Sequence, residues 1–116
     1  MKIIFYLKSN GKAPVEKYID DLSLQEQARI LSCLKSLEND GFDTPRVQFR
    51  QIQNMLWEIK IKSGISHRIF YVVIDKEELV LLHAYKKQTQ KAPLKEIKIA
   101  KSRMQEVLNG KKKNIR

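Results

Sequence analysis

The residues in this sequence that are best suited to chemistry are basic side chains placed around three apolar segments. They are Lys60, Lys62, Arg68, Lys86, Lys87 and Lys91, and they are joined by the carboxylate Glu58. Strict alternation over residues 56–62 puts Glu58, Lys60 and Lys62 on one face of a strand, opposite the apolar side chains. Arg68 joins this face if the following turn preserves the facing. Convergent cations of this kind bind phosphates and stabilise negative charge that develops at phosphorus.

Arg68 is the most informative of these residues, because it is a charged residue in a strand that is otherwise apolar over residues 69–74. A guanidinium in that setting either pairs with a carboxylate, for which Glu58 is the candidate, or binds an anionic ligand. Two roles are open for Glu58, which could act as a general base or serve only as the ion-pair partner of Arg68. For any single lysine on a solvated sheet face an ordinary surface role is the simpler interpretation, so the hypothesis depends on the cluster.

We expect structural roles for the remaining reactive side chains. His67 lies on the strand face opposite Arg68, and His83 is flanked by apolar residues. Trp57 belongs to the apolar face of its strand. Cys33 is the single cysteine, so it cannot form an internal disulfide, and it falls in an apolar helical stripe. Two isolated histidines and one thiol lack the spacing of zinc ligands, which disfavours a metalloenzyme and predicts no metal or other cofactor.

The elements that must position the cluster follow from periodicity and turn residues. We expect a strand at residues 2–7, a helical hairpin at 14–40, an irregular extended segment at 47–52, strands at 56–62, 67–75 and 79–85, and a final helix that opens at Pro93. Ser23 and Glu26 have the capping-box pattern, and Gly41 is the expected C-cap. This order predicts an α+β domain in which an antiparallel sheet of three to four strands follows the first strand. We expect helices on one face of the sheet and an open second face.

Charge is distributed unevenly along the 116 residues. The 23 Lys and Arg exceed the 13 Asp and Glu by a net charge of +10. The two signs balance over residues 1–58, so the whole excess lies in residues 59–116. This asymmetry favours a polyanionic partner, nucleic acid before membrane, and a merely solubilising surface is the alternative.

Length and hydropathy predict one cytoplasmic domain. A chain with 42% hydrophobic residues, 4 Gly and 3 Pro can bury a core. It contains no apolar run near the roughly 18 residues that span a bilayer, and its opening apolar stretch is too short for a signal peptide. We expect the domain to cover residues 1–110 and to be followed by a basic flexible tail at 111–116.

Three separated segments resemble one known family. They are Leu-Trp-Glu-Ile-Lys at residues 56–60, Arg-Ile-Phe-Tyr at 68–71, and the segment at 80–93 that contains Lys-Lys-Gln-Thr-Gln-Lys-Ala-Pro, followed by Glu96, Ile97 and Ala100. In order and type they are similar to the phage-derived, HigB-like branch of the RelE/ParE toxin superfamily. The lysine-rich element before the last helix is close to a signature of that branch, with one residue inserted or shifted. The similarity spans nearly the whole chain and is weakest at residues 40–54.

The resemblance implies a RelE-like fold and the toxin of a type II toxin–antitoxin system. Such a toxin cleaves mRNA in the ribosomal decoding site without metal and is neutralised by a small helix-turn-helix antitoxin in an oligomeric complex. By the same resemblance the positions of Lys60, Arg68, Lys86 and Lys87 line the active cleft. Lys60 stands where this branch usually has arginine. Glu58 stands where the better-studied RelE relatives have lysine, although glutamate is common in the HigB-like branch.

The implied reaction is attack of an RNA 2′-hydroxyl on the adjacent phosphorus, which cations can promote. Arg68 is the expected clamp on the phosphorane, and Lys60 and Lys87 are expected phosphate ligands or proton carriers. With Glu58 as the possible base, these residues form the predicted catalytic set. The predicted outer RNA-binding set is Lys62, Lys86, Gln90, Lys91, Lys111, Lys112 and Lys113.

Two other functions remain open at this level. The charge of +10 and the lack of a conventional acid–base pair permit a non-catalytic nucleic-acid-binding module. The other branch of the superfamily, which poisons gyrase, shares the fold and gives the second alternative.

Overall fold

The computed structural model describes residues 1–63, 65–88 and 93–110, apart from the side chains of residues 62 and 63. Its elements are β1 (Lys2–Phe5), α1 (Pro14–Asp20), α2 (Leu24–Asp40), the short 3-10 helix η1 (Gly41–Asp43), β2 (Gln48–Gln53), β3 (Leu56–Ser63), β4 (Ile65–Ile74), β5 (Glu78–Lys86) and α3 (Leu94–Gly110). None of the helices in these ranges is both long and apolar enough to cross a membrane. The predicted α+β order is confirmed.

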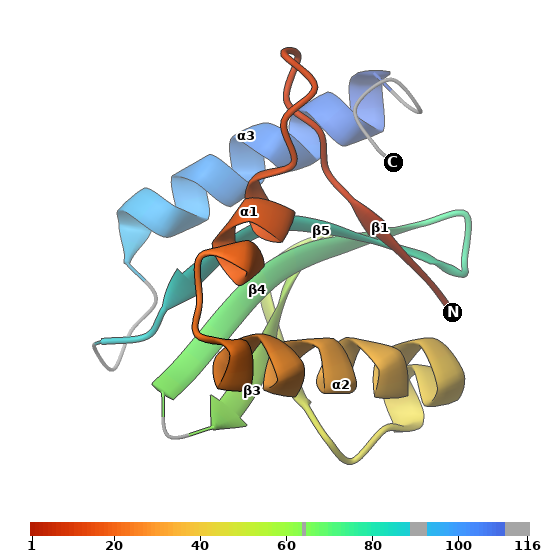
Figure 1. The fold of residues 1–116 in the computed structure, drawn as a ribbon. Coiled ribbons are helices and arrows are strands. Elements are labelled where there is room, and N and C mark those ends of the chain that lie inside the picture. Colours follow the sequence, from red (N-terminus) through yellow and green to blue (C-terminus); the bar gives the residue numbers. More distant parts are fainter. Residues whose placement is uncertain (64, 89–92, 111–116) are drawn as a thin grey trace.

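The strands form one sheet in the order β1-β5-β4-β3-β2 (Figure 1). Strands β2 to β5 are antiparallel neighbours, as short connections require. Strand β1 pairs with β5 in parallel, with Ile4 opposite Val80. Because the chain passes through α1 and α2 before it enters β2, β1 is free to take the far edge beside β5. The sheet is therefore mixed, with an antiparallel meander and one parallel edge strand.

The helical hairpin forms as its end signals predict. Pro14 occupies the first turn of α1. The Ser23 side chain accepts a hydrogen bond from the Glu26 backbone N–H at 3.2 Å and so caps α2. Gly41 ends α2 with φ of +61°, a conformation that costs glycine little. These caps set the hairpin against the sheet.

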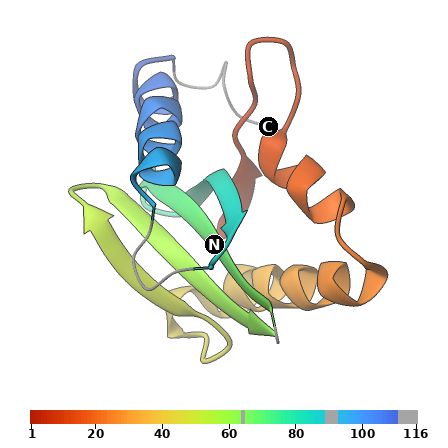
Figure 2. The ribbon, with the colours of Figure 1, turned by 90° about the vertical axis from the view of Figure 1, so that its left-hand side faces the viewer.

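Helices cover both faces of the sheet, so the expectation of one open face is wrong. Helices α1 and α2 pack on one face, and α3 packs on the opposite face (Figures 1 and 2). The reason lies in β4 and β5, whose buried residues run consecutively from His67 to Val72 and from Leu79 to Leu82 instead of alternating. The apolar stripe of α3, with Ala100, Met104 and Val107, buries the second face.

Candidate active site

Strand register brings the predicted catalytic residues together on the α3 face of the sheet. Lys60 lies opposite Arg68 across β3 and β4, and Arg68 lies opposite Tyr85 across β4 and β5. Arg50 lies opposite Glu58 across β2 and β3. Directly opposite residues share a sheet face, so four strands contribute to one polar site.

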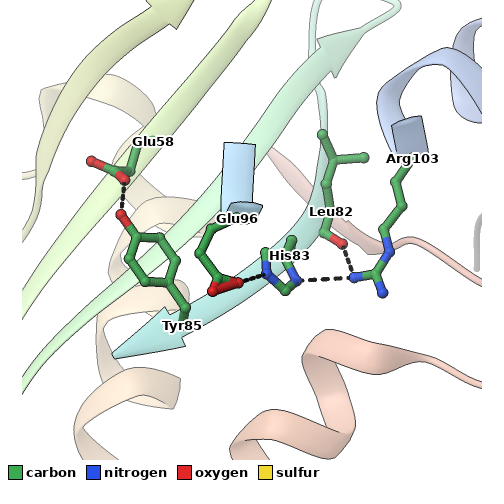
Figure 3. A network of polar contacts seen from close by, with 6 residues as sticks. All are labelled: Glu58, Leu82, His83, Tyr85, Glu96 and Arg103. Carbon is green, nitrogen blue, oxygen red and sulfur yellow. Dashed lines mark hydrogen bonds and ion pairs between the residues drawn. The ribbon is translucent and has the colours of Figure 1, made fainter. Parts of the chain in front are cut away.

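Glu58 is the centre of this site. Its side chain is fully buried, and its Oε1 lies 3.1 Å from Arg68 Nη1 and 3.2 Å from Arg50 Nη2. The Tyr85 hydroxyl donates to Oε2 at 2.8 Å (Figure 3). Burial, followed by the hydrogen bond to Glu58, raises the pKa of Tyr85, so the phenol keeps its proton as a donor. One carboxylate thus holds two guanidinium groups and a phenol in a fixed arrangement.

Arg68 is held by Glu58 but is not saturated by it. The residue is 8% exposed, and its Nε is buried without a hydrogen-bond partner in the part of the chain that the structure describes. An unsatisfied buried donor costs about 1–3 kcal/mol, and more for a charged group. The guanidinium therefore keeps donor capacity that no acceptor among the described residues satisfies.

Four cations surround the single carboxylate, and we call Arg50, Lys60, Arg68 and Lys87 the cation cluster. The pKa of Lys87 is lowered by burial first and then by Arg68, with smaller contributions in the same direction from Arg50 and Lys60. Glu58 opposes this shift. The backbone N–H of Lys87 donates to the Ser66 carbonyl at 2.8 Å, which fixes the exit of β5 beside β4. The positive charges are close enough to disfavour one another, so an anion among them would be stabilised.

Of the outer residues predicted to bind RNA, Lys86 is the one whose side chain lies in the described part of the structure. Lys86 is exposed and lies opposite His67, so its side chain points to the sheet face away from Tyr85 and Lys87. Lys62 pairs with Ser66 in the β3–β4 ladder, and its side chain is outside the described part. Outside the described residues lie Gln90, Lys91, Lys111, Lys112 and Lys113.

Sequence reasoning missed Arg50 and Tyr85. Arg50 falls in the segment where the family resemblance is weakest, and a register irregularity between Gln51 and Gln53 obscures the alternation of β2. Tyr85 stands near the end of an apolar strand, and its partner Glu58 is 27 residues away in the sequence, so no local pattern marks it as part of the site. A regular hairpin around residues 54–55 would have placed Gln51 opposite Glu58, and only the register shift between Gln51 and Gln53 brings Arg50 to that position.

Both histidines make structural contacts, in agreement with the roles expected of them. His67 is fully buried, with Nδ1 at 2.7 Å from the Tyr18 hydroxyl and Nε2 at 2.7 Å from Glu26 Oε1. It therefore ties α1 and α2 to β4. Together these bonds satisfy both ring nitrogens.

His83 makes a second such link, to α3. Arg103 Nη1 lies 3.1 Å from His83 Nδ1 and can only donate, so Nδ1 accepts. The proton of the neutral ring is then on Nε2, which donates to Glu96 Oε1 at 2.6 Å (Figure 3). Burial is the main cause that lowers the pKa of His83 and favours this neutral form.

Fold and site together define a compact α+β domain with a cation-lined site on a mixed sheet. The chain belongs to the family described as Phage derived protein Gp49-like, whose model matches residues 17–105. This family is a toxin family of the RelE superfamily and is associated with RelE/HigB-type toxins, which agrees with the resemblance seen in the sequence. Comparison with curated proteins gives no match. The matched range contains the whole cation cluster together with Glu58 and Tyr85.

Proposed function

We propose that this protein is the toxin of a type II toxin–antitoxin pair and acts as a ribosome-dependent, metal-independent mRNA endoribonuclease of the HigB-like branch. Arg68 is the observation that carries the proposal. One of its nitrogens is anchored on Glu58 while its buried Nε lacks a partner among the described residues, and three more cations stand around it. A phosphoryl oxygen bound at the exposed part of Arg68, among the other three cations, would accept from the guanidinium and offset their positive charge.

In the proposed reaction, the RNA 2′-oxygen attacks the adjacent phosphorus and forms a bond to it, and the bond from phosphorus to the 5′-oxygen breaks. The products are a 2′,3′-cyclic phosphate and a free 5′-hydroxyl. Arg68 binds the phosphorane oxygens, with Lys60 as a second ligand on its exposed side. The 2′-hydroxyl proton passes to solvent water, and the Lys87 ammonium protonates the departing 5′-oxygen. Its lowered pKa makes Lys87 a better acid for this step.

In this mechanism Glu58 positions the cations and is not the base. Full burial and three donors leave its carboxylate engaged with Arg50, Arg68 and Tyr85. The Arg50 side chain is 39% exposed, so this guanidinium can turn one edge to Glu58 and another to RNA. The family's association with toxins supports an antitoxin as the protein partner, and we propose an oligomeric complex with a helix-turn-helix antitoxin.

The test is to induce the protein in cells and to map RNA ends by primer extension. We expect growth to stop and new 5′ ends to arise within translated regions. With Arg68→Ala, which is catalytically disabled in this proposal, those ends should be absent while the protein accumulates folded. Intact transcripts together with gyrase-dependent DNA damage would overturn the proposal in favour of a gyrase poison. Binding to RNA without any cleavage would favour the non-catalytic module.

A further inference from the structure

Helix α3 carries an outward row of lysines that the cation cluster does not include. Lys95, Lys98 and Lys101 are all exposed and are three residues apart. Among the described residues none of the three has an ion pair. We call these three residues the lysine row.

The spacing of the row works against the helix. Residues three and four apart are neighbours on a helix surface, where like charges are destabilising. Lys98 has Lys95 and Lys101 as its neighbours at a distance of three, and no carboxylate lies three or four residues from any member within α3. In a surface helix that contributes only to solubility and stability, positive and negative side chains are expected to alternate along the exposed face. The three lysines therefore repel one another along α3, and no carboxylate of α3 three or four residues away offsets this repulsion.

The two carboxylates of α3 accept hydrogen bonds from residues outside the helix instead of pairing with these lysines. Glu96 accepts a hydrogen bond from His83 at 2.6 Å (Figure 3), and Glu106 accepts one from the Tyr6 hydroxyl at 2.9 Å. Arg103 lies between them, with its guanidinium carbon 5.3 Å from the centre of the Tyr6 ring. The exposed side of α3 therefore carries three lysines without an ion pair among the described residues, and its one exposed carboxylate, Glu106, is bonded to Tyr6.

The side chains exposed on α3 indicate which kind of anionic ligand the lysine row fits. A membrane-surface helix needs an exposed apolar face, but the apolar stripe of α3 is buried on the sheet. Single-stranded RNA is bound largely by stacking on aromatic side chains, and the exposed residues of α3 include none. Six residues of helix carry the row over about 9 Å. That leaves the regularly spaced phosphates of base-paired RNA as the fitting ligand.

We propose that the lysine row docks the phosphate backbone of structured RNA and supplies affinity, while the cation cluster supplies cleavage. The inference rests on the proposed function only where it identifies the structured RNA as ribosomal RNA. The row lies on the solvent side of α3, whereas the cluster lies on the strands that α3 partly covers.

The experiment compares two triple variants of equal charge. Lys95→Gln, Lys98→Gln and Lys101→Gln remove the row, and Lys8→Gln, Lys12→Gln and Lys35→Gln remove three exposed lysines elsewhere. Binding to purified ribosomes and to a 20-base-pair RNA duplex is measured over a range of salt concentrations. We expect the row variant to lose about two to three units of the slope of log K against log salt, and on the order of tenfold or more in affinity at moderate salt. The control variant should change less than about threefold.

The single-turnover cleavage rate at saturating ribosome separates this inference from the proposed function. The row variant should keep that rate, and Arg68→Ala should lose it while keeping duplex affinity. If wild-type protein does not cleave, the proposed function fails, and the duplex measurement still tests the row. Equal weakening by both triple variants would overturn the inference, because diffuse net charge would then explain binding. So would unchanged RNA binding with lost binding to the antitoxin, because the row would then be a protein interface.

Discussion

His67 and Arg68 are neighbours on β4 that point to opposite faces of the sheet, and their surroundings differ in kind. His67 is fully buried with both ring nitrogens bonded, to Tyr18 and to Glu26. Arg68 is nearly as buried, but one of its donors has no acceptor among the described residues. On the His67 face both polar ring atoms have partners, whereas on the Arg68 face one guanidinium N–H lacks an acceptor among the described residues. Incomplete satisfaction at a rigid position distinguishes a ligand site from a structural network better than residue type does.

The largest expected effect is on catalysis at Arg68. Arg68→Ala should lower the saturated cleavage rate by at least two orders of magnitude, which corresponds to about 3 kcal/mol of transition-state stabilisation. Arg68→Lys keeps the charge but loses the planar pair of donors, and it should recover little of the rate. Single-turnover kinetics and circular dichroism check this. Unfolding of both variants would show that Arg68 has a structural role, as His67 does on the other face.

The second effect should appear in stability and not in activity. His67→Leu leaves Tyr18 and Glu26 without their buried partner and should lower the free energy of unfolding by about 2–3 kcal/mol. Tyr18→Phe removes one bond only and should cost about 1 kcal/mol. Denaturant titration measures both, and cleavage per folded molecule should stay unchanged. A cleavage defect in folded Tyr18→Phe would bring the His67 face into the active site.

Lys86 and Lys87 offer a second test of the difference between the two faces, because they are adjacent and point to opposite faces. Lys87→Ala should reduce the saturated rate by roughly tenfold or more with little change in ribosome affinity, as expected for a proton donor. Lys86→Ala should change that rate less than about twofold. Equal effects would mean that only the total charge matters.

The smallest expected effect is the pH dependence of stability from His83. Burial lowers its pKa in the folded state below the ordinary value, so the unfolded chain binds the proton more readily. Stability that depends on neutral His83 is therefore complete above the unfolded pKa of about 6.5 and is lost as pH falls below it. Glu96 and Arg103 face the ring and act in opposite directions on it. His83→Gln should flatten the stability profile below neutral pH, and an unchanged slope would contradict the assignment.

Most element boundaries could be predicted from the sequence, since they depend on local signals. The N-cap at Ser23, the C-cap at Gly41 and the alternation of residues 56–62 each act within a few residues. The parallel placement of β1 beside β5 was not predicted, because pairing between strands far apart in sequence leaves no local mark. The covering of the second sheet face by α3 was missed for a related reason. A consecutive apolar run such as residues 69–73 identifies a buried strand but not the helix that buries it.

Alternation within residues 56–62 is enough to place Glu58 and Lys60 on one face of β3, because period two is a local property of a strand. That Arg68 joins them depends also on the turn between β3 and β4, which sets Arg68 opposite Lys60. That Arg50 and Tyr85 complete the site, that Lys87 joins it and that Lys86 does not could be seen only in the folded structure. These facts depend on cross-strand register and on the direction in which β5 ends. Recognition of the lysine row likewise required the fold, because only the structure shows that Glu96 and Glu106 accept hydrogen bonds from His83 and Tyr6 and do not pair with these lysines.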